Sequence, residues 1–266
     1  MVVEERDVQL SGPELELAWR SLRLQDYPVV LELLSHGATR SERDELLGAA
    51  RRALRERGLW DDHGPEPLLA RYLQTLAVPD TEVDVRGRGP AGRWRGLVAG
   101  GPAATVLVVQ RDGLHTLTPV SAGSMAAAVL STLPDADPAA GQLNAPSAEL
   151  HRAFTTVGSD ERALGAVLRE LGASAADAGA LARALPTARG SAQIGAAARS
   201  HGPRRRAPRV VALLDTDVGR YLVIETRSRD RQPWTTYVPA TPVRVHAAVQ
   251  ELLATVTGGG WSPASR

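Results

Sequence analysis

The spacing of apolar residues changes along the chain from a helical period to a period of two. Before residue 80 they recur every three or four positions, which predicts a helix starting at Pro13 and helices over Ser41–Arg57 and Pro65–Val78. A short strand is expected ahead of them at Val8–Leu10. The alternation that follows predicts four strands joined by glycine-containing turns, at Glu82–Arg86, Arg93–Ala99, Ala103–Gln110 and Leu114–Pro119. A short helix is expected at Ser124–Leu133.

The same order of elements then returns in the second half of the chain. Pro134–Pro146, rich in proline and alanine with little periodicity, is predicted to be a linker. Two helices are expected next, over Ser159–Leu171 and Ser174–Leu185. The remaining predictions are four strands and a closing helix, at Gln193–Ala198, Arg209–Leu214, Arg220–Thr226, Trp234–Val238 and Thr241–Val256.

Short sequence matches support an internal duplication. Pro119-Val120-Ser121 and Pro239-Ala240-Thr241 lie 120 residues apart, each between a strand and a helix. Two helical matches have offsets of 117 and 112, namely Leu47-Gly48-Ala49 with Leu164-Gly165-Ala166 and Leu69-Ala70-Arg71 with Leu181-Ala182-Arg183. Helices that follow strand meanders, rather than alternating with single strands, favour an α+β fold.

The predicted organisation is therefore two α+β halves that share one sheet and form one integrated domain. We expect an N-terminal half over residues 1–133, a linker over 134–146, a C-terminal half over 147–257 and a tail over 258–266. The alternative is that the matches are a coincidence between two similar α+β halves.

Composition excludes several chemistries and leaves the charge almost balanced. The 266 residues contain no cysteine, and all 31 basic residues are arginines, which excludes thiol nucleophiles, thiolate metal sites, Schiff-base lysines and a P-loop lysine. Residues 1–133 hold 15 arginines and 18 acids, whereas residues 134–266 hold 16 arginines and 12 acids. No signal peptide, membrane insertion or dedicated nucleic-acid-binding charge is expected.

Two motifs resemble catalytic or cofactor sites but have the wrong context. Gly87–Gly92 fits the G-x-G-x-x-G pattern, yet a strand follows it instead of the helix that a dinucleotide needs, so a basic hairpin is expected. Asp215-Thr216-Asp217 resembles a phosphatase motif, but the chain has no lysine, so a hairpin turn is favoured over an aspartate-dependent phosphatase. The six histidines are scattered, and no metal site is expected.

Arg199–Arg209 supplies the alternative function. It contains five arginines and no acid, which is compatible with nucleic-acid binding, although no aromatic residues alternate with them. A solvated loop and a contact with an acidic protein are the other interpretations.

Three segments together resemble the EspG family of type VII (ESX) secretion-associated proteins. They are Gln193–Ala197, Arg204–Val211 and Asp215–Leu222, the last with a D-T-x-x-G-R-Y core. The helix with Leu15 to Trp19, the segment Tyr27–Leu31 and the strand ending at Pro239 agree with it. The resemblance extends from about Leu10 to Val256.

The resemblance implies a central antiparallel sheet flanked by two helical bundles, with quasi-two-fold halves. It implies a cytoplasmic chaperone that binds a PE–PPE-like helical client, keeps it soluble and delivers it for export. Such a protein has no catalytic residues, no cofactor and no metal, and it could form a homodimer. The partner-binding candidates are Arg88, Arg93, Trp94, Gln193, Arg220, Trp234 and Thr236, because the sheet is expected to supply much of the docking surface.

Overall fold

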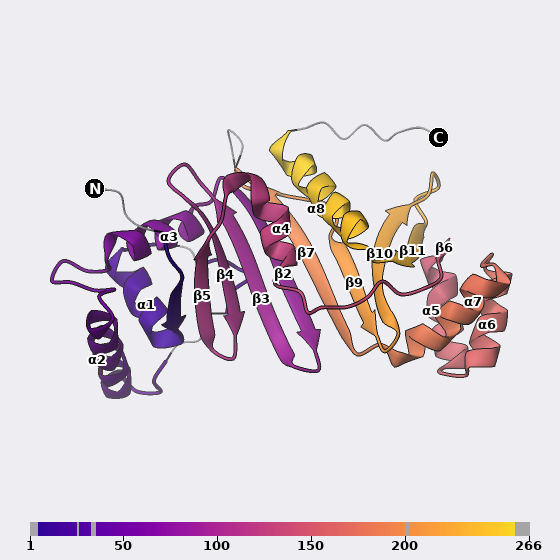
Figure 1. Ribbon diagram of the computed structural model, residues 1–266, viewed down its shortest axis with the longest axis horizontal. Helices are drawn as coiled ribbons and strands as arrows, with labels where there is room; N and C mark the ends of the chain where they lie inside the picture. The colour runs from indigo at the N-terminus through magenta and orange to yellow at the C-terminus, as the bar shows by residue number, and fades with distance from the viewer. Residues whose placement is uncertain (1–4, 26, 33–35, 200–202, 259–266) are drawn as a thin grey trace.

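The computed structural model describes residues 5–25, 27–32, 36–199 and 203–258, which are arranged around one long antiparallel sheet (Figure 1). Its strands are β1 (Val8–Ser11), β2 (Thr81–Gly89), β3 (Gly92–Gly100), β4 (Thr105–Arg111), β5 (Leu114–Pro119), β6 (Leu143–Pro146), β7 (Gly190–Ala198), β8 (Arg205–Arg206), β9 (Val211–Thr216), β10 (Gly219–Arg227) and β11 (Pro233–Pro239). The helices are α1 (Gly12–Ser21), α2 (Arg40–Glu56), α3 (Pro67–Ala77), α4 (Met125–Leu130), α5 (Ser147–Val157), α6 (Glu161–Glu170), α7 (Ala175–Ala184) and α8 (Pro242–Thr257), with short 3₁₀ turns at Ala122–Ser124 and Leu185–Thr187.

The order of strands across the sheet has a quasi-two-fold symmetry. It reads β1-β5-β4-β3-β2-β7-β9-β10-β11-β6, so each half contributes five strands and the two halves meet at β2 and β7. At each outer edge is a four-residue strand, β1 or β6, that leads directly into a helix. The predicted α+β fold with two duplicated halves is confirmed.

The symmetry can be given a register, because β2 and β7 each have nine residues and pair antiparallel. Matching their ends sets Thr81 against Gly190 and Gly89 against Ala198, an offset of 109. With this offset Val85 is equivalent to Ile194, and these two residues are also cross-strand partners. The pseudo-two-fold axis therefore passes through the Val85–Ile194 pair.

The two faces of the sheet are covered differently. On one face, α4 and α8 lie across the middle strands and enclose a core with Val85, Val98 and Ile194 (Figure 1). On the other face, α1–α3 pack over β3, β4 and β5 at one end, and α5–α7 pack over β10, β11 and β6 at the other. We call these the helix-covered face and the open face, because on the latter the two bundles leave β2 and β7 uncovered between them.

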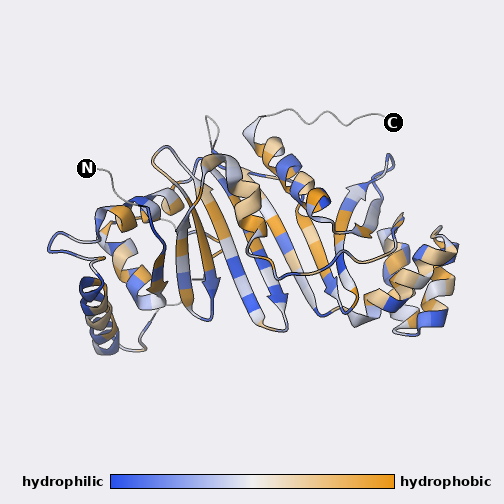
Figure 2. Ribbon diagram, viewed as in Figure 1, coloured by the Kyte–Doolittle hydropathy of each residue, from blue (hydrophilic) through white to orange (hydrophobic). Residues whose placement is uncertain are grey.

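The strands alternate as expected for a sheet with two different faces (Figure 2). On β2, Val83 and Val85 belong to the helix-covered core, whereas Glu82, Asp84 and Arg86 project to the open face. Each carboxylate among them must find a partner, because a buried charge without one is costly.

Several sequence predictions are corrected in detail. The segment predicted as a linker contains the edge strand β6, which pairs with β11. Helix α5 (Ser147–Val157) was not predicted, and β8 lies within the segment expected to be a loop. Helix α2 begins at Arg40 with Thr39 as its cap, rather than with Ser41. The predicted tail, apart from Gly258, lies outside the described residues.

The sheet brings two glycines against bulky side chains. A Cβ atom on Gly87 would lie 2.1 Å from the ring of Trp94, and one on Gly195 would lie 2.2 Å from Nη2 of Arg206. Gly87 therefore has to lack a side chain, whereas a side chain at Gly195 would displace the guanidinium group of Arg206. The first closes the helix-covered core at the β2–β3 hairpin, and the second admits an arginine onto the open face.

Candidate functional site

A cavity of about 440 Å³ opens on the open face, beside the N-terminal bundle. One wall is apolar and is formed by Pro28, Val29, Leu76, Ala77 and Pro79. Val29 is 82% exposed, so its side chain is accessible to a partner. The other wall is charged and includes Glu82, Asp84, Arg86, Arg199, Arg204 and Arg206.

Two ion pairs hold the segment after β7 across this face. Arg206 donates through Nη1 and Nη2 to the two carboxylate oxygens of Asp84, at 2.6 and 3.0 Å. Arg204 donates through Nε to Glu82 at 2.8 Å, with a second contact from its Nη2. We call residues 203–206 the strap, since these contacts fasten them to β2.

The buried partners are the carboxylates, not the guanidinium groups. The side chain of Asp84 is 6% exposed and that of Arg206 is 43% exposed. The hydrogen bonds that Arg206 donates to Asp84 raise the pKa of the Arg206 guanidinium above its usual value. Bidentate geometry of this kind makes the pair both strong and directional.

A second cavity, of about 230 Å³, lies at the β2–β3 hairpin and shares Arg86 with the first. Arg86 and Arg88 on β2, Arg93 and Arg95 on β3, and Ser191 and Gln193 on β7 line it from the open face. We call the two cavities, which share Arg86 in their linings, the central groove. The groove runs along β2 and crosses the pseudo-two-fold axis.

The structure brings three of the predicted partner-binding residues together in this groove. Arg88 and Arg93 are cross-strand partners and are both exposed, and Gln193 is the partner of Arg86. Arg88 donates through Nε to Oγ of Ser191 at 3.1 Å. The basic hairpin expected from Gly87–Gly92 is confirmed, with a two-residue Pro90-Ala91 turn.

Two other predicted residues are buried, which argues against a direct contact with a partner. Trp94 is 4% exposed and faces the helix-covered core. Arg220 is 7% exposed; it donates to Asp215 at 2.5 and 3.0 Å and to the carbonyl oxygen of Pro134 at 2.8 Å. Alternation in the sequence could not show which of these side chains the helices would cover.

Trp234 and Thr236 lie on the opposite side of the sheet from the central groove. They pair with Thr226 and Ile224 on β10, on the face that carries α8. Both are partly buried, and Oγ1 of Thr236 donates to the side-chain oxygen of Asn144 at 2.8 Å. The seven candidates therefore do not form one surface.

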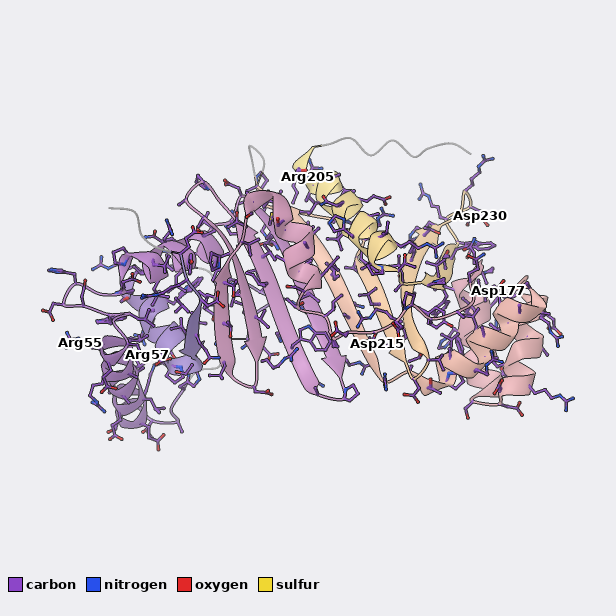
Figure 3. The ribbon with its side chains drawn as sticks, in the orientation of Figure 1. Arg55, Arg57, Asp177, Arg205, Asp215 and Asp230 are labelled. Atoms are coloured by element: carbon purple, nitrogen blue, oxygen red, sulfur yellow. The ribbon has the colours of Figure 1, made fainter. Side chains whose placement is uncertain are left out.

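The alternative functions lose support from the same contacts. In the basic segment Arg199–Arg209, Arg204, Arg206 and Arg209 pair with Glu82, Asp84 and Glu251, so much of its charge is neutralised. Arg205 and Asp215 lie at opposite ends of the strands (Figure 3). Asp215 is paired with Arg220 and Asp217 with Arg189, in the hairpin turn that was predicted.

Sequence reasoning missed the residues that shape the groove most. Glu82 and Asp84 alternate with apolar residues on a predicted strand, which signals a face with buried charge, but their partners lie 122 residues away. Val29 and Arg95 come from segments whose contact could not be read from spacing: Arg95 donates to the carbonyl oxygen of Val30 at 3.0 Å and pairs with Glu32.

Neither a metal cluster nor a membrane span is found in the part of the chain that the structure describes. No group of three or more His, Asp or Glu residues there could hold a metal ion. No helix there is long and apolar enough to cross a bilayer.

Comparison with known proteins identifies the family. A model of the EspG family matches residues 11–251. The chain belongs to the EspG family. Among its relatives are the ESX-3 secretion-associated protein EspG3 of Mycolicibacterium smegmatis, 27% identical over 89% of this chain and 83% of that protein, and the ESX-1 secretion-associated protein EspG1 of Mycobacterium tuberculosis, 25% identical over 90% and 84%.

The fold is that of a solved EspG structure. The type VII secretion system chaperone EspG5 of Mycobacterium tuberculosis, in complex with a PE25–PPE41 dimer, superimposes with a TM-score of 0.75. The match covers 96% of this chain and 99% of that one at 22% identity, so it establishes the EspG fold over nearly the whole molecule.

Proposed function

We propose that this protein is a cytoplasmic secretion chaperone that binds a PE–PPE-like helical heterodimer of a type VII secretion system. The observation that carries the proposal is the family match over residues 11–251, together with a fold shared end to end with EspG5. The chaperone would keep its client soluble and deliver it for export. This role consists of binding and release, and it needs no covalent step.

The central groove offers a surface suited to such a client. A helical pair that must not self-associate presents an apolar tip, and a specific interface combines an apolar centre with a polar rim. The groove has both, since its apolar wall includes the exposed Val29 and its floor is charged. An interface of standard size, roughly 1,600 Å², would extend beyond either cavity.

Co-expression with candidate PE–PPE-like heterodimers, followed by gel filtration, tests the proposal. One of them should co-elute with the chain at the mass of a complex, and the free chain should elute as a monomer or homodimer. Failure of every PE–PPE-like pair encoded in the same genome to co-purify would overturn the proposed function.

Two exposed valines provide a matched pair of variants for the surface. Val29 lines the groove on the open face, and Val243 stands at the start of α8; they are 82% and 79% exposed. We expect Val29→Asp to weaken client binding at least tenfold, and Val243→Asp to change it less than twofold. The reverse order would place the client on the helix-covered face.

A further inference from the structure

We infer that the client presents an acidic segment to the β2–β3 end of the central groove, where Arg86, Arg88 and Arg93 bind its carboxylates. The inference rests on the proposed function, in that the partner is a protein client. It goes beyond that proposal by assigning the chemistry of the contact and the residues that recognise it.

The first support is the register of four arginines. Arg86 is the direct cross-strand partner of Arg95, and Arg88 is the direct partner of Arg93, all on the open face. Side chains directly opposite on neighbouring strands are close enough for like charges to destabilise the pairing. The Arg88–Arg93 pair, in which neither arginine has an acidic partner among the described residues, is a cost to the fold that a ligand of opposite charge would offset.

The second support is the absence of internal compensation. Arg95 pairs with Glu32. Arg86 donates to the carbonyl oxygen of Val29, at 3.2 Å, and Arg88 to the hydroxyl of Ser191. Among the described residues, no carboxylate forms an ion pair with Arg86, Arg88 or Arg93. Three guanidinium groups thus remain uncompensated around one cavity.

The third support is that two of these groups are held in place. The hydrogen bonds to Val29 and Ser191 fix one edge of Arg86 and of Arg88, respectively, leaving other N–H groups free for a ligand. The arginine fork matches a carboxylate in geometry, and a preorganised fork loses less entropy on binding. The cavity beside them, about 230 Å³, has room for acidic side chains.

A protein ligand fits this site better than a nucleic acid. Single-stranded nucleic acid binding combines arginines with aromatic rings on which bases stack. The aromatic residue of this cavity, Trp94, is buried on the other side of the sheet. The neighbouring cavity contributes an apolar wall, as expected for a protein interface.

The test compares labelled decaglutamate, labelled single-stranded DNA and the co-purifying PE–PPE-like heterodimer, each at 50 and 300 mM salt. The wild-type chain should bind decaglutamate and the heterodimer, both at least tenfold more weakly at the higher salt. Tighter binding to the DNA than to the peptide would overturn the choice of a protein ligand.

Two kinds of variant identify the residues. Arg88→Glu/Arg93→Glu should weaken binding of both protein probes at least thirtyfold. The control Arg52→Glu/Arg229→Glu makes the same change in net charge at exposed positions away from the groove and should alter binding less than twofold. Equal effects of the two double variants would overturn the inference.

A substitution on β7 tests the site while leaving every arginine in place. Ser191→Glu sets a carboxylate beside Arg88, so it should occupy the guanidinium groups and weaken binding at least tenfold without loss of thermal stability. Ser191→Gln, of the same length but neutral, should bind within threefold of wild type. Unchanged binding in Ser191→Glu would overturn the inference even where the heterodimer still co-purifies, so this failure is distinct from failure of the proposed function.

Discussion

On one side of the pseudo-two-fold axis between β2 and β7 the arginines of the strap are paired with carboxylates, and on the other side Arg86 and Arg88 have no carboxylate partner among the described residues. On one side, Glu82 and Asp84 receive Arg204 and Arg206 of the strap. With the offset of 109, the equivalent positions on the other side are Ser191 and Gln193, which are neutral and face Arg88 and Arg86. The same open face therefore carries one closed charge network and one open charge cluster.

The difference follows from what lies opposite each pair of positions. Opposite Glu82 and Asp84 on β7 stand Ala197 and Gly195, and the missing side chain of Gly195 leaves room for the guanidinium group of Arg206. Opposite Ser191 and Gln193 stand the arginines of β2 themselves. A duplicated framework can thus keep one copy for stability and free the other for recognition, and each side can be tested separately.

The largest expected effect is loss of the closed network. Arg206→Ala leaves the carboxylate of Asp84, which is 6% exposed, without its bidentate partner. Breaking such a buried pair costs about 3 kcal/mol of unfolding free energy. Arg88→Ala removes no partner from a buried carboxylate, so it should change the free energy by less than about 0.5 kcal/mol. Urea denaturation of both variants measures the contrast.

A double-mutant cycle separates the ion pair from the packing of the strap. If the pair carries the effect, Asp84→Asn/Arg206→Ala should be destabilised much less than the sum of the two single variants. Strict additivity would mean that Arg206 acts through its aliphatic contacts, and equal costs for Arg206→Ala and Arg88→Ala would break the comparison altogether.

The second-largest expected effect is a loss of stability at low pH that comes from His115 in the N-terminal half. His115 on β5 is 1% exposed, and burial lowers its pKa to about 4, from the usual histidine value of 6.5. An interaction with the backbone of Leu10 favours the protonated ring, but burial outweighs it. The unfolded chain binds the proton of His115 more tightly than the folded chain does. The contribution of His115 to the unfolding free energy is therefore complete above about pH 6.5 and declines as the pH falls toward 4.

Between pH 7 and pH 5 this group should remove about 2 kcal/mol of unfolding free energy. The measurement is chemical denaturation at both pH values, with His115→Phe as the variant that lacks the titrating group. Other groups titrate in both proteins, so the quantity to compare is the change in unfolding free energy with pH in the wild type and in the variant. An identical pH dependence in the two proteins would show that His115 is not the cause.

Much of this fold follows from local sequence features, and the two halves show why. The meander of β2–β5, with its period of two and glycine turns, was predictable, as were the capped helices and the shared order of elements. The edge strand β6 was not, because its four residues follow a proline-rich segment and its pairing with β11 is decided by tertiary contacts. The local pattern of apolar and polar residues alone cannot specify such an edge strand.

The site was predictable only in part, for a physical reason. Arg88 falls in the predicted basic hairpin, Arg93 and Gln193 begin predicted strands, and the structure brings the three together. Trp94 and Arg220 belong to equally regular strands but project to the face that α4 and α8 cover. The alternation of apolar and polar residues separates the two faces of a strand without saying which face a helix will bury. The arginine partners of Glu82 and Asp84 lie far away in the sequence.

The smallest expected change in unfolding free energy comes from a substitution in the open cluster of Arg86, Arg88 and Arg93. Arg93→Thr removes the like charge opposite Arg88 and introduces a residue with high β-propensity on an exposed strand, so it should raise the unfolding free energy by about 0.5 kcal/mol. The electrostatic part of this gain should vanish at 1 M salt, where the Debye length is about 3 Å. The same substitution should weaken binding of decaglutamate, because it removes one of the three uncompensated guanidinium groups.

Denaturation at low and high salt, with Arg52→Thr as the control on α2, distinguishes the effect of charge from that of β-propensity. A loss of stability in Arg93→Thr at low salt would mean that the hairpin needs this arginine for its own folding. A gain in stability together with weaker binding would show that the open side of the axis gives up stability for recognition, whereas the strap side does not.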